Sequence, residues 1–143
     1  MKNPSVSSEA PERLSLPRRL SEQMIDQCQR DAPLEACGLL LGNGETVTEI
    51  REMNNSDAEA EHYMMEPEEQ FEVFKELRER EELVVGIYHS HPASEAHPSP
   101  EDVRLAFYPG IIYVIISLAG KEPVIRGFKI IEEKIEEVEI ETV

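Results

Sequence analysis

Cysteine and basic residues are scarce in this chain, and each shortage excludes a class of protein. Only Cys28 and Cys37 occur among the 143 residues. Two cysteines are too few for a disulfide framework, and their spacing is not that of a C-x-x-C motif. We therefore expect reduced thiols, as in a cytoplasmic protein. A chain of roughly 150 residues buries enough surface to form one hydrophobic core without disulfide bonds.

Lysine and arginine together number 14, against 30 aspartates and glutamates, so the formal net charge is −16. A negative field of this size repels phosphate backbones and anionic lipid headgroups. Nucleic acid and membrane surfaces are thus excluded as expected partners. A protein partner with a basic or neutral contact face is favoured instead.

Long apolar runs are also missing. No stretch has the length of a signal-peptide core or reaches the ~20 apolar residues of a transmembrane helix. Residues 1–15 are rich in serine, proline and charge. We therefore expect a flexible leader over 1–15, followed by a single domain over residues 16–143.

The pattern of apolar residues predicts a mixed α+β domain with a single central mixed β-sheet flanked by helices. Glycines at positions 42 and 44 mark a hairpin turn, and residues 134–142 alternate imperfectly between apolar residues and glutamate, as in a half-exposed edge strand. The predicted helices span 18–31, 67–82 and 100–107, and the other predicted strands span 36–42, 45–53, 83–88, 111–118 and 124–131.

Three of the four histidines lie within nine positions, and two of them directly follow the predicted strand 83–88. If His89 and His91 stay extended, their side chains point the same way with about 6.6 Å of rise between them, so both imidazoles can reach one ion. On a helix the two side chains would diverge by roughly 200°. The strand context therefore favours a chelating pair, although ordinary surface polarity also explains a His-x-His in a loop.

A third ligand is available in the segment from Ser99 to Asp102, which has the form of a helix start with Ser99 as N-cap. A short loop folds this helix back toward the strand end, so the Asp102 carboxylate can join the two histidines. Two imidazoles and one carboxylate leave a tetrahedral zinc ion with one open position, as in hydrolytic sites. A purely structural capping box explains Ser99 and Asp102 as well. His97 is expected to be a loop histidine or to lie at the rim of the site.

These residues together resemble a known motif. The run His89-Ser90-His91-Pro92, six further residues, Ser99 and Asp102 is similar to the JAMM motif of the MPN+ (JAB) metalloisopeptidases. The segment 33–42 resembles the family's upstream glutamate and apolar strand in bacterial and archaeal members, and the resemblance covers roughly residues 18–131. It implies the MPN/JAB (cytidine-deaminase-like) fold and a Zn²⁺ ion held by His89, His91 and Asp102.

By this resemblance, Glu35 is the catalytic base that takes a proton from water on the zinc ion and passes it to the leaving amine, while Ser99 stabilises the oxyanion. The residues alone do not single out Glu35 among the 30 acidic side chains, and an ordinary helix-to-strand connector explains it too. Its neighbours Leu34 and Ala36 are apolar, and such surroundings raise a carboxyl pKa toward neutrality. Cys37 is expected to be a small buried hydrophobic residue, because this mechanism needs no thiol.

The implied substrate is the bond after the C-terminal Gly-Gly tail of a ubiquitin-like modifier or sulfur-carrier protein. The loop 54–66 is short beside the insertions of eukaryotic deubiquitinases of this family, and little chain follows Asp102. We therefore expect a stand-alone prokaryotic-type enzyme, monomeric or homodimeric, without chain-linkage specificity. The sequence neither names the physiological substrate nor decides between tail processing and deconjugation.

Two other classes of function stay open. One is a noncatalytic MPN-type interaction module with a structural metal, against which the intact set of His89, His91, Asp102 and Glu35 argues. The other is a zinc hydrolase or deaminase that acts on small molecules. The chain has neither the Pro-Cys-x-x-Cys of nucleobase deaminases nor the His-Glu-x-x-His of ordinary metalloproteases.

Overall fold

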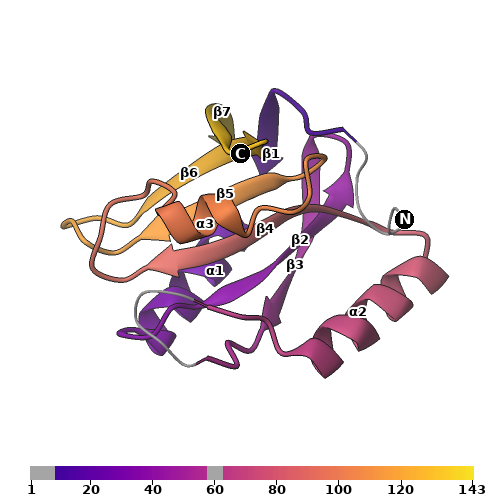
Figure 1. The fold of residues 1–143 in the computed structure, drawn as a ribbon, viewed down its shortest axis with the longest axis horizontal. Helices are drawn as coiled ribbons and strands as arrows, with labels where there is room; N and C mark the ends of the chain where they lie inside the picture. The colour runs from indigo at the N-terminus through magenta and orange to yellow at the C-terminus, as the bar shows by residue number, and fades with distance from the viewer. Residues whose placement is uncertain (1–8, 58–62) are drawn as a thin grey trace.

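The computed structural model describes residues 9–57 and 63–143, and these residues form a mixed α+β fold (Figure 1). The predicted helices over 18–31 and 67–82 are confirmed, although the second ends at Glu79. The predicted hairpin and the strands that follow it are also confirmed. The elements of the described residues are β1 (Arg13–Leu16), α1 (Arg18–Asp31), β2 (Cys37–Asn43), β3 (Thr46–Met53), α2 (Pro67–Glu79), β4 (Leu83–His91), α3 (Pro100–Arg104), β5 (Ile112–Ser117), β6 (Val124–Ile131) and β7 (Lys134–Thr142).

The strands make one mixed sheet that closes on itself in the order β1-β3-β2-β4-β5-β6-β7. β2 lies antiparallel between β3 and β4, and β4 runs parallel to β5. β1 completes the ring because it pairs in parallel with both β3 and β7. β4 therefore lies well inside the sheet, with a hydrogen-bonded strand on each side.

Two expectations about the chain ends are wrong. Residues 13–15 do not belong to a leader, because Leu14 and Leu16 alternate with polar residues in β1 and are fully buried. β7 is not an edge strand, since β6 flanks it on one side and β1 on the other. A four-residue strand carries too short an alternation to be recognised before its partners are known. The rest of the expected leader, residues 1–8, lies outside the described residues.

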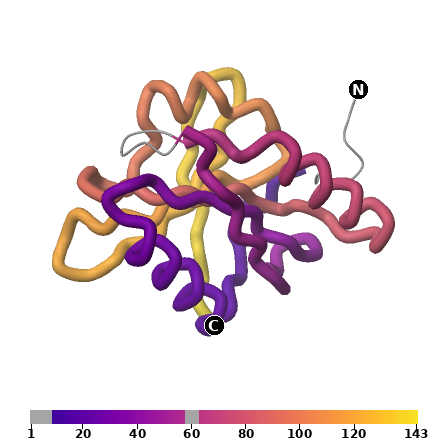
Figure 2. The backbone as a smooth tube through the Cα atoms, turned by 90° about the horizontal axis from the view of Figure 1, so that it is seen from below, coloured from indigo at the N-terminus to yellow at the C-terminus, as the bar shows by residue number. Residues whose placement is uncertain are grey.

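The helices cover opposite faces of the strands (Figures 1 and 2). α1 packs on one face through Leu20, Met24 and Cys28, whose four-residue spacing aligns them along the helix. α2 packs on the other face through Val73 and Leu77. α3 lies on the same side as α2, above the carboxyl end of β4 (Figure 1). This end of β4 carries the two histidines, so α3 and the histidines meet there.

Among the described residues, no helix combines the length and apolar character needed to cross a bilayer.

Candidate metal centre

β4 extends through His91, three residues beyond the predicted strand, so both histidines have extended backbone. Their side chains point to the same face of the sheet, as the i, i+2 spacing predicts. Nε2 of His89 lies 3.2 Å from Nε2 of His91. Both side chains are almost completely buried, at 2% and 5% exposure. The predicted pair is therefore formed inside the protein, not on its surface.

Asp102 reaches this pair from the first turn of α3. Its Oδ2 lies 3.2 Å from Nε2 of His89 and 3.1 Å from Nε2 of His91. The predicted capping box is also present: the Asp102 amide donates to Ser99 Oγ at 3.0 Å, and the Ser99 amide donates to Asp102 Oδ2 at 2.9 Å. The capping role and the contact with the histidines thus coexist in one side chain.

The three converging atoms have the separations of ligands on a small cation. Tetrahedral zinc with bonds of about 2.0–2.1 Å places its ligand atoms about 3.3 Å apart, close to the distances of 3.1–3.2 Å found here. Nδ1 of His91 donates to the Glu95 carbonyl at 2.8 Å, which leaves Nε2 of the neutral ring with a lone pair toward the site. Three electron-pair donors thus face one another, and a divalent ion fits them.

The charges of the site favour a cation as well. Burial raises the pKa of the Asp102 carboxyl, but its contacts with His89 and His91 lower it far more, and the net pKa lies well below its ordinary range. Burial lowers the pKa of His91, whereas its bonds to Asp102 and to the Glu95 carbonyl raise it, and the net shift is upward. Asp102 is thus held in its negative form, and the positive form of His91 is stabilised. Together these two shifts show a site that favours positive charge. The group His89, His91 and Asp102 could hold a metal ion.

Glu35 lies just before β2 and is 97% buried, with 3% exposure. β2 and β4 are antiparallel, and Cys37 stands opposite His89. Alternation along β2 therefore turns the side chain of Glu35 toward the same face as the histidines. Its charge contributes to raising the pKa of His91. The carbonyl of Glu35 accepts a hydrogen bond from Asn55 Nδ2 at 3.1 Å.

The other residues considered from the sequence lie outside the group of three. His97 is exposed in the loop after β4, as expected for a loop histidine. Its ring makes a T-shaped contact with Phe128, with 5.8 Å between the ring centroids. Cys37 is fully buried, and its thiol donates to the Met53 carbonyl at 3.7 Å. Burial raises the pKa of Cys37 to about 12, in keeping with a hydrophobic role. Of the loop 54–66, residues 58–62 lie outside the described residues.

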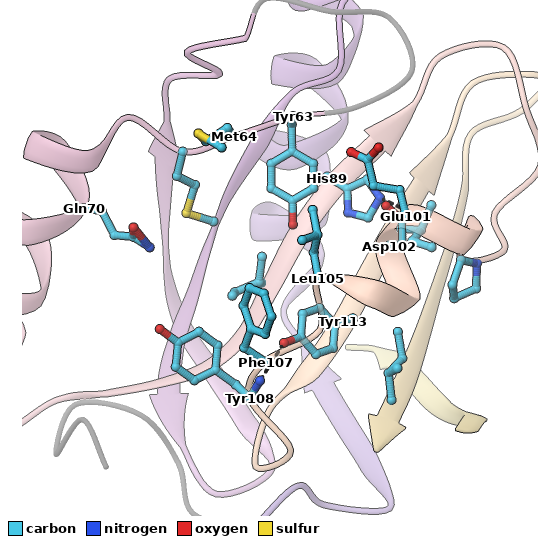
Figure 3. A pocket seen from close by; sticks show the side chains of 15 residues that line it. Tyr63, Met64, Gln70, His89, Glu101, Asp102, Leu105, Phe107, Tyr108 and Tyr113 are labelled. Carbon is cyan, nitrogen blue, oxygen red and sulfur yellow. Dashed lines mark hydrogen bonds and ion pairs between the residues drawn. The ribbon is translucent and has the colours of Figure 1, made fainter. Parts of the chain in front are cut away.

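A mostly apolar cavity of about 310 Å³ opens beside His89 and Asp102 (Figure 3). Tyr63 stacks on His89 with 4.7 Å between the ring centroids, and its hydroxyl points into the cavity (Figure 3). Leu105 and Phe107, both exposed, form the wall that follows α3. Sequence reasoning missed this cavity, because its walls come from separate segments that share no motif.

The fold and the site match known proteins. A family model described as prokaryotic homologs of the JAB domain matches residues 17–131. The CysO-cysteine peptidase of Mycobacterium tuberculosis is 33% identical over 127 residues, which cover 87% of this chain and 87% of that protein. The desampylase of Haloferax volcanii is 34% identical over 116 residues, covering 76% of this chain and 84% of that protein.

Solved structures agree with these matches. A protein from Desulfitobacterium hafniense has a TM-score of 0.81 and 39% identity, covering 91% of this chain and 92% of its own. A JAB1/MPN domain protein from Archaeoglobus fulgidus has a TM-score of 0.64 and covers 93% of this chain and all of its own; at 22% identity it shows the fold alone. The expected MPN/JAB fold is confirmed. The protein belongs to the family of prokaryotic JAB-domain homologs.

Proposed function

We propose that this protein is a zinc-dependent peptidase of the JAMM type. It would cleave the bond that follows the C-terminal Gly-Gly tail of a ubiquitin-like modifier or sulfur-carrier protein. The observation that carries the proposal is the convergence of His89, His91 and Asp102 within 3.2 Å of one another, beside a buried carboxyl at Glu35. Two buried imidazoles and one carboxylate are a donor set that zinc prefers, and they leave one coordination position for the reaction.

The relatives support the class of substrate. One is a CysO-cysteine peptidase and another a desampylase, and each aligns over at least three quarters of this chain. The strongly negative charge of the chain disfavours nucleic acid and favours a protein substrate without a large acidic surface. A small modifier protein satisfies both conditions.

Zinc bound at this site would acidify a water molecule and polarise the scissile carbonyl. Glu35 would take a proton from the attacking water and deliver it to the leaving amine. Its carboxyl is buried on the face of the histidines, within reach of the reacting groups, and a carboxyl so placed can hold the proton between the two transfers. His89, His91 and Asp102 would hold the ion.

Ser99 would stabilise the negative oxygen of the tetrahedral intermediate. Its Oγ accepts the Asp102 amide at 3.0 Å, so the hydroxyl hydrogen can be donated to another acceptor. The capping bond also fixes the rotamer of Ser99, and a donor held in place in advance stabilises developing charge without reorganisation.

The cavity beside the site would take substrate residues next to the scissile bond. Tyr63, Leu105 and Phe107 line it (Figure 3), and burial raises the pKa of Tyr63 well above its ordinary value. The hydroxyl of Tyr63 therefore keeps its hydrogen for a carbonyl of an extended tail. Apolar side chains of the tail would fill the remaining volume.

The proposal is tested with the zinc-loaded protein and a panel of Gly-Gly-tailed modifiers fused to lysine or to short peptides. Intact mass should show release of the fused group after the second glycine, and a chelator should abolish it. Cleavage that persists in chelator would contradict the metal mechanism. Zinc binding without cleavage of any panel member would instead favour the noncatalytic interaction module.

A further inference from the structure

Ser90 lies between the two histidines on β4, but its side chain points to the opposite face of the strand, toward α1. It is completely buried. The Ala36 amide donates to Ser90 Oγ at 2.8 Å, and the Ser90 amide donates to the Ala36 carbonyl at 3.0 Å. A single residue thus engages both backbone polar groups of Ala36.

Ala36 immediately follows Glu35. Alternation along the chain turns the Ala36 side chain toward α1, where it packs in the same cluster as Cys28, and turns Glu35 toward the histidines. The peptide that links Glu35 to Ala36 is therefore held at its nitrogen by the Ser90 hydroxyl. This bond spans 54 positions in the sequence and joins the segment with the proposed base to the strand with two proposed ligands.

The bond has no ready substitute. Ala36 is buried, so water cannot replace the hydroxyl without a rearrangement, and an unpaired buried amide is strongly disfavoured. The next residue along is held as well, because Gln27 Nε2 donates to the Cys37 carbonyl at 3.0 Å. Without the hydroxyl, the Glu35–Ala36 peptide is the part that can shift to satisfy its amide.

We propose that Ser90 is a positioning residue for Glu35: its hydrogen bond to the Ala36 amide sets the place of the Glu35 carboxyl against the group of His89, His91 and Asp102. The inference rests on the proposed function, in which Glu35 carries the proton. A displacement of a catalytic group by about 1 Å is enough to cost on the order of 100-fold in rate. Ser90 therefore acts on turnover without contacting the substrate.

The first test compares the full-length, zinc-loaded protein with its Ser90→Ala variant. We expect kcat to fall by about 10- to 100-fold while KM and the zinc content stay unchanged. Ser90→Thr keeps the hydroxyl and should restore most of kcat, whereas Ser90→Cys keeps the packing with a weaker acceptor and should lose activity even if Ser90→Ala does not fold. Ser21→Ala is the matched control, because it removes another buried hydroxyl, bonded to the Arg18 carbonyl at 2.7 Å, and should leave kcat unchanged.

The second test is a double-mutant cycle with Glu35→Gln, read as the residual rate of cleavage. If Ser90 acts through Glu35, Ser90→Ala adds little to the loss caused by Glu35→Gln alone. The inference would be overturned if the losses of the two single variants multiplied in the double variant. It would also be overturned if Ser90→Ala lost zinc, or if its kcat equalled that of Ser21→Ala. Full activity of Glu35→Gln would instead overturn the proposed base, so the two failures are distinguishable.

Discussion

Ser99 and Asp102 exchange two hydrogen bonds across the first turn of α3, and the oxygen that accepts the Ser99 amide, Oδ2 of Asp102, is the same atom that faces the histidines. One carboxylate oxygen thus closes the helix start and completes the group of three. The shared atom explains how a helix of only five residues presents a carboxylate in a fixed place: the capping bonds hold the rotamer before any ion arrives.

Replacing Ser99 with alanine should lower both stability and rate. Loss of an N-cap hydroxyl costs about 1 kcal/mol of stability, and loss of an oxyanion donor on the order of 10²–10³ in kcat. Ser99→Thr is the matched control, since it keeps a hydroxyl for both roles. Thermal unfolding and steady-state kinetics measure the two effects. A lowered melting temperature with an unchanged kcat would reduce Ser99 to a capping residue.

His89→Ala should remove both metal binding and cleavage. It takes away one of three donors, and the remaining pair of His91 and Asp102 holds zinc far more weakly. Metal content after gel filtration and the rise in melting temperature on adding zinc give the readout. His97→Ala removes an exposed histidine outside the group and should behave like the unchanged protein. Equal zinc content in both variants would rule out His89 as a ligand.

Glu35→Gln should keep the metal and lose turnover. The amide has nearly the size of the carboxylate but cannot carry the proton, so kcat should fall by about 10²–10⁴-fold while zinc content is unchanged. Glu52→Gln serves as control, because Glu52 is a more exposed carboxylate paired with Arg30 at 2.7 Å. A fully active Glu35→Gln would show that another group carries the proton.

Alkylating reagents should leave the native enzyme active. Burial raises the pKa of both Cys28 and Cys37 to about 12, so neither thiol ionises near neutral pH and neither is reached from solvent. Mass spectrometry after treatment with iodoacetamide should show an unmodified chain, and modification should begin only on unfolding. Rapid labelling of the folded protein with loss of cleavage would contradict the buried role of Cys37.

Glu76 should make part of the stability depend on acid pH. Hydrogen bonds from Arg51 and Arg80 lower the pKa of Glu76 to about 2. Because the folded pKa lies below the unfolded one, the stabilisation is complete above about pH 4.5 and disappears as the pH falls toward 2.

The comparison is between the unchanged protein and Glu76→Gln, by chemical denaturation across this range. Their difference in free energy of unfolding should be small, because the site is exposed, and should vanish at the acid end. Glu72→Gln, an exposed position on the same helix, is the control. A difference that does not change with pH would show that the ion pairs contribute nothing.

Most of the fold followed from local patterns, and the exceptions have a common cause. Four-residue spacing predicts α1, and the apolar run before His89 predicts β4, since each pattern repeats over enough residues to be specific. β1 was missed because four residues carry little periodicity, and the burial of Leu14 depends on strands from the far end of the chain. Because β1 pairs with β7 through backbone hydrogen bonds, the predicted edge strand is an inner strand of the sheet.

The sequence alone determined the chemistry: the types and spacing of His89, His91, Ser99 and Asp102 define a donor set and a helix cap, because strand alternation and capping are local. Which groups share the site depends on long-range contacts in the fold. The tertiary structure brought Glu35 to the histidine face through the pairing of β2 with β4, and assembled the cavity around Tyr63 from distant segments. These contacts depend on strand register and closure of the sheet, which are set by packing across the whole chain and leave no signal at any single position.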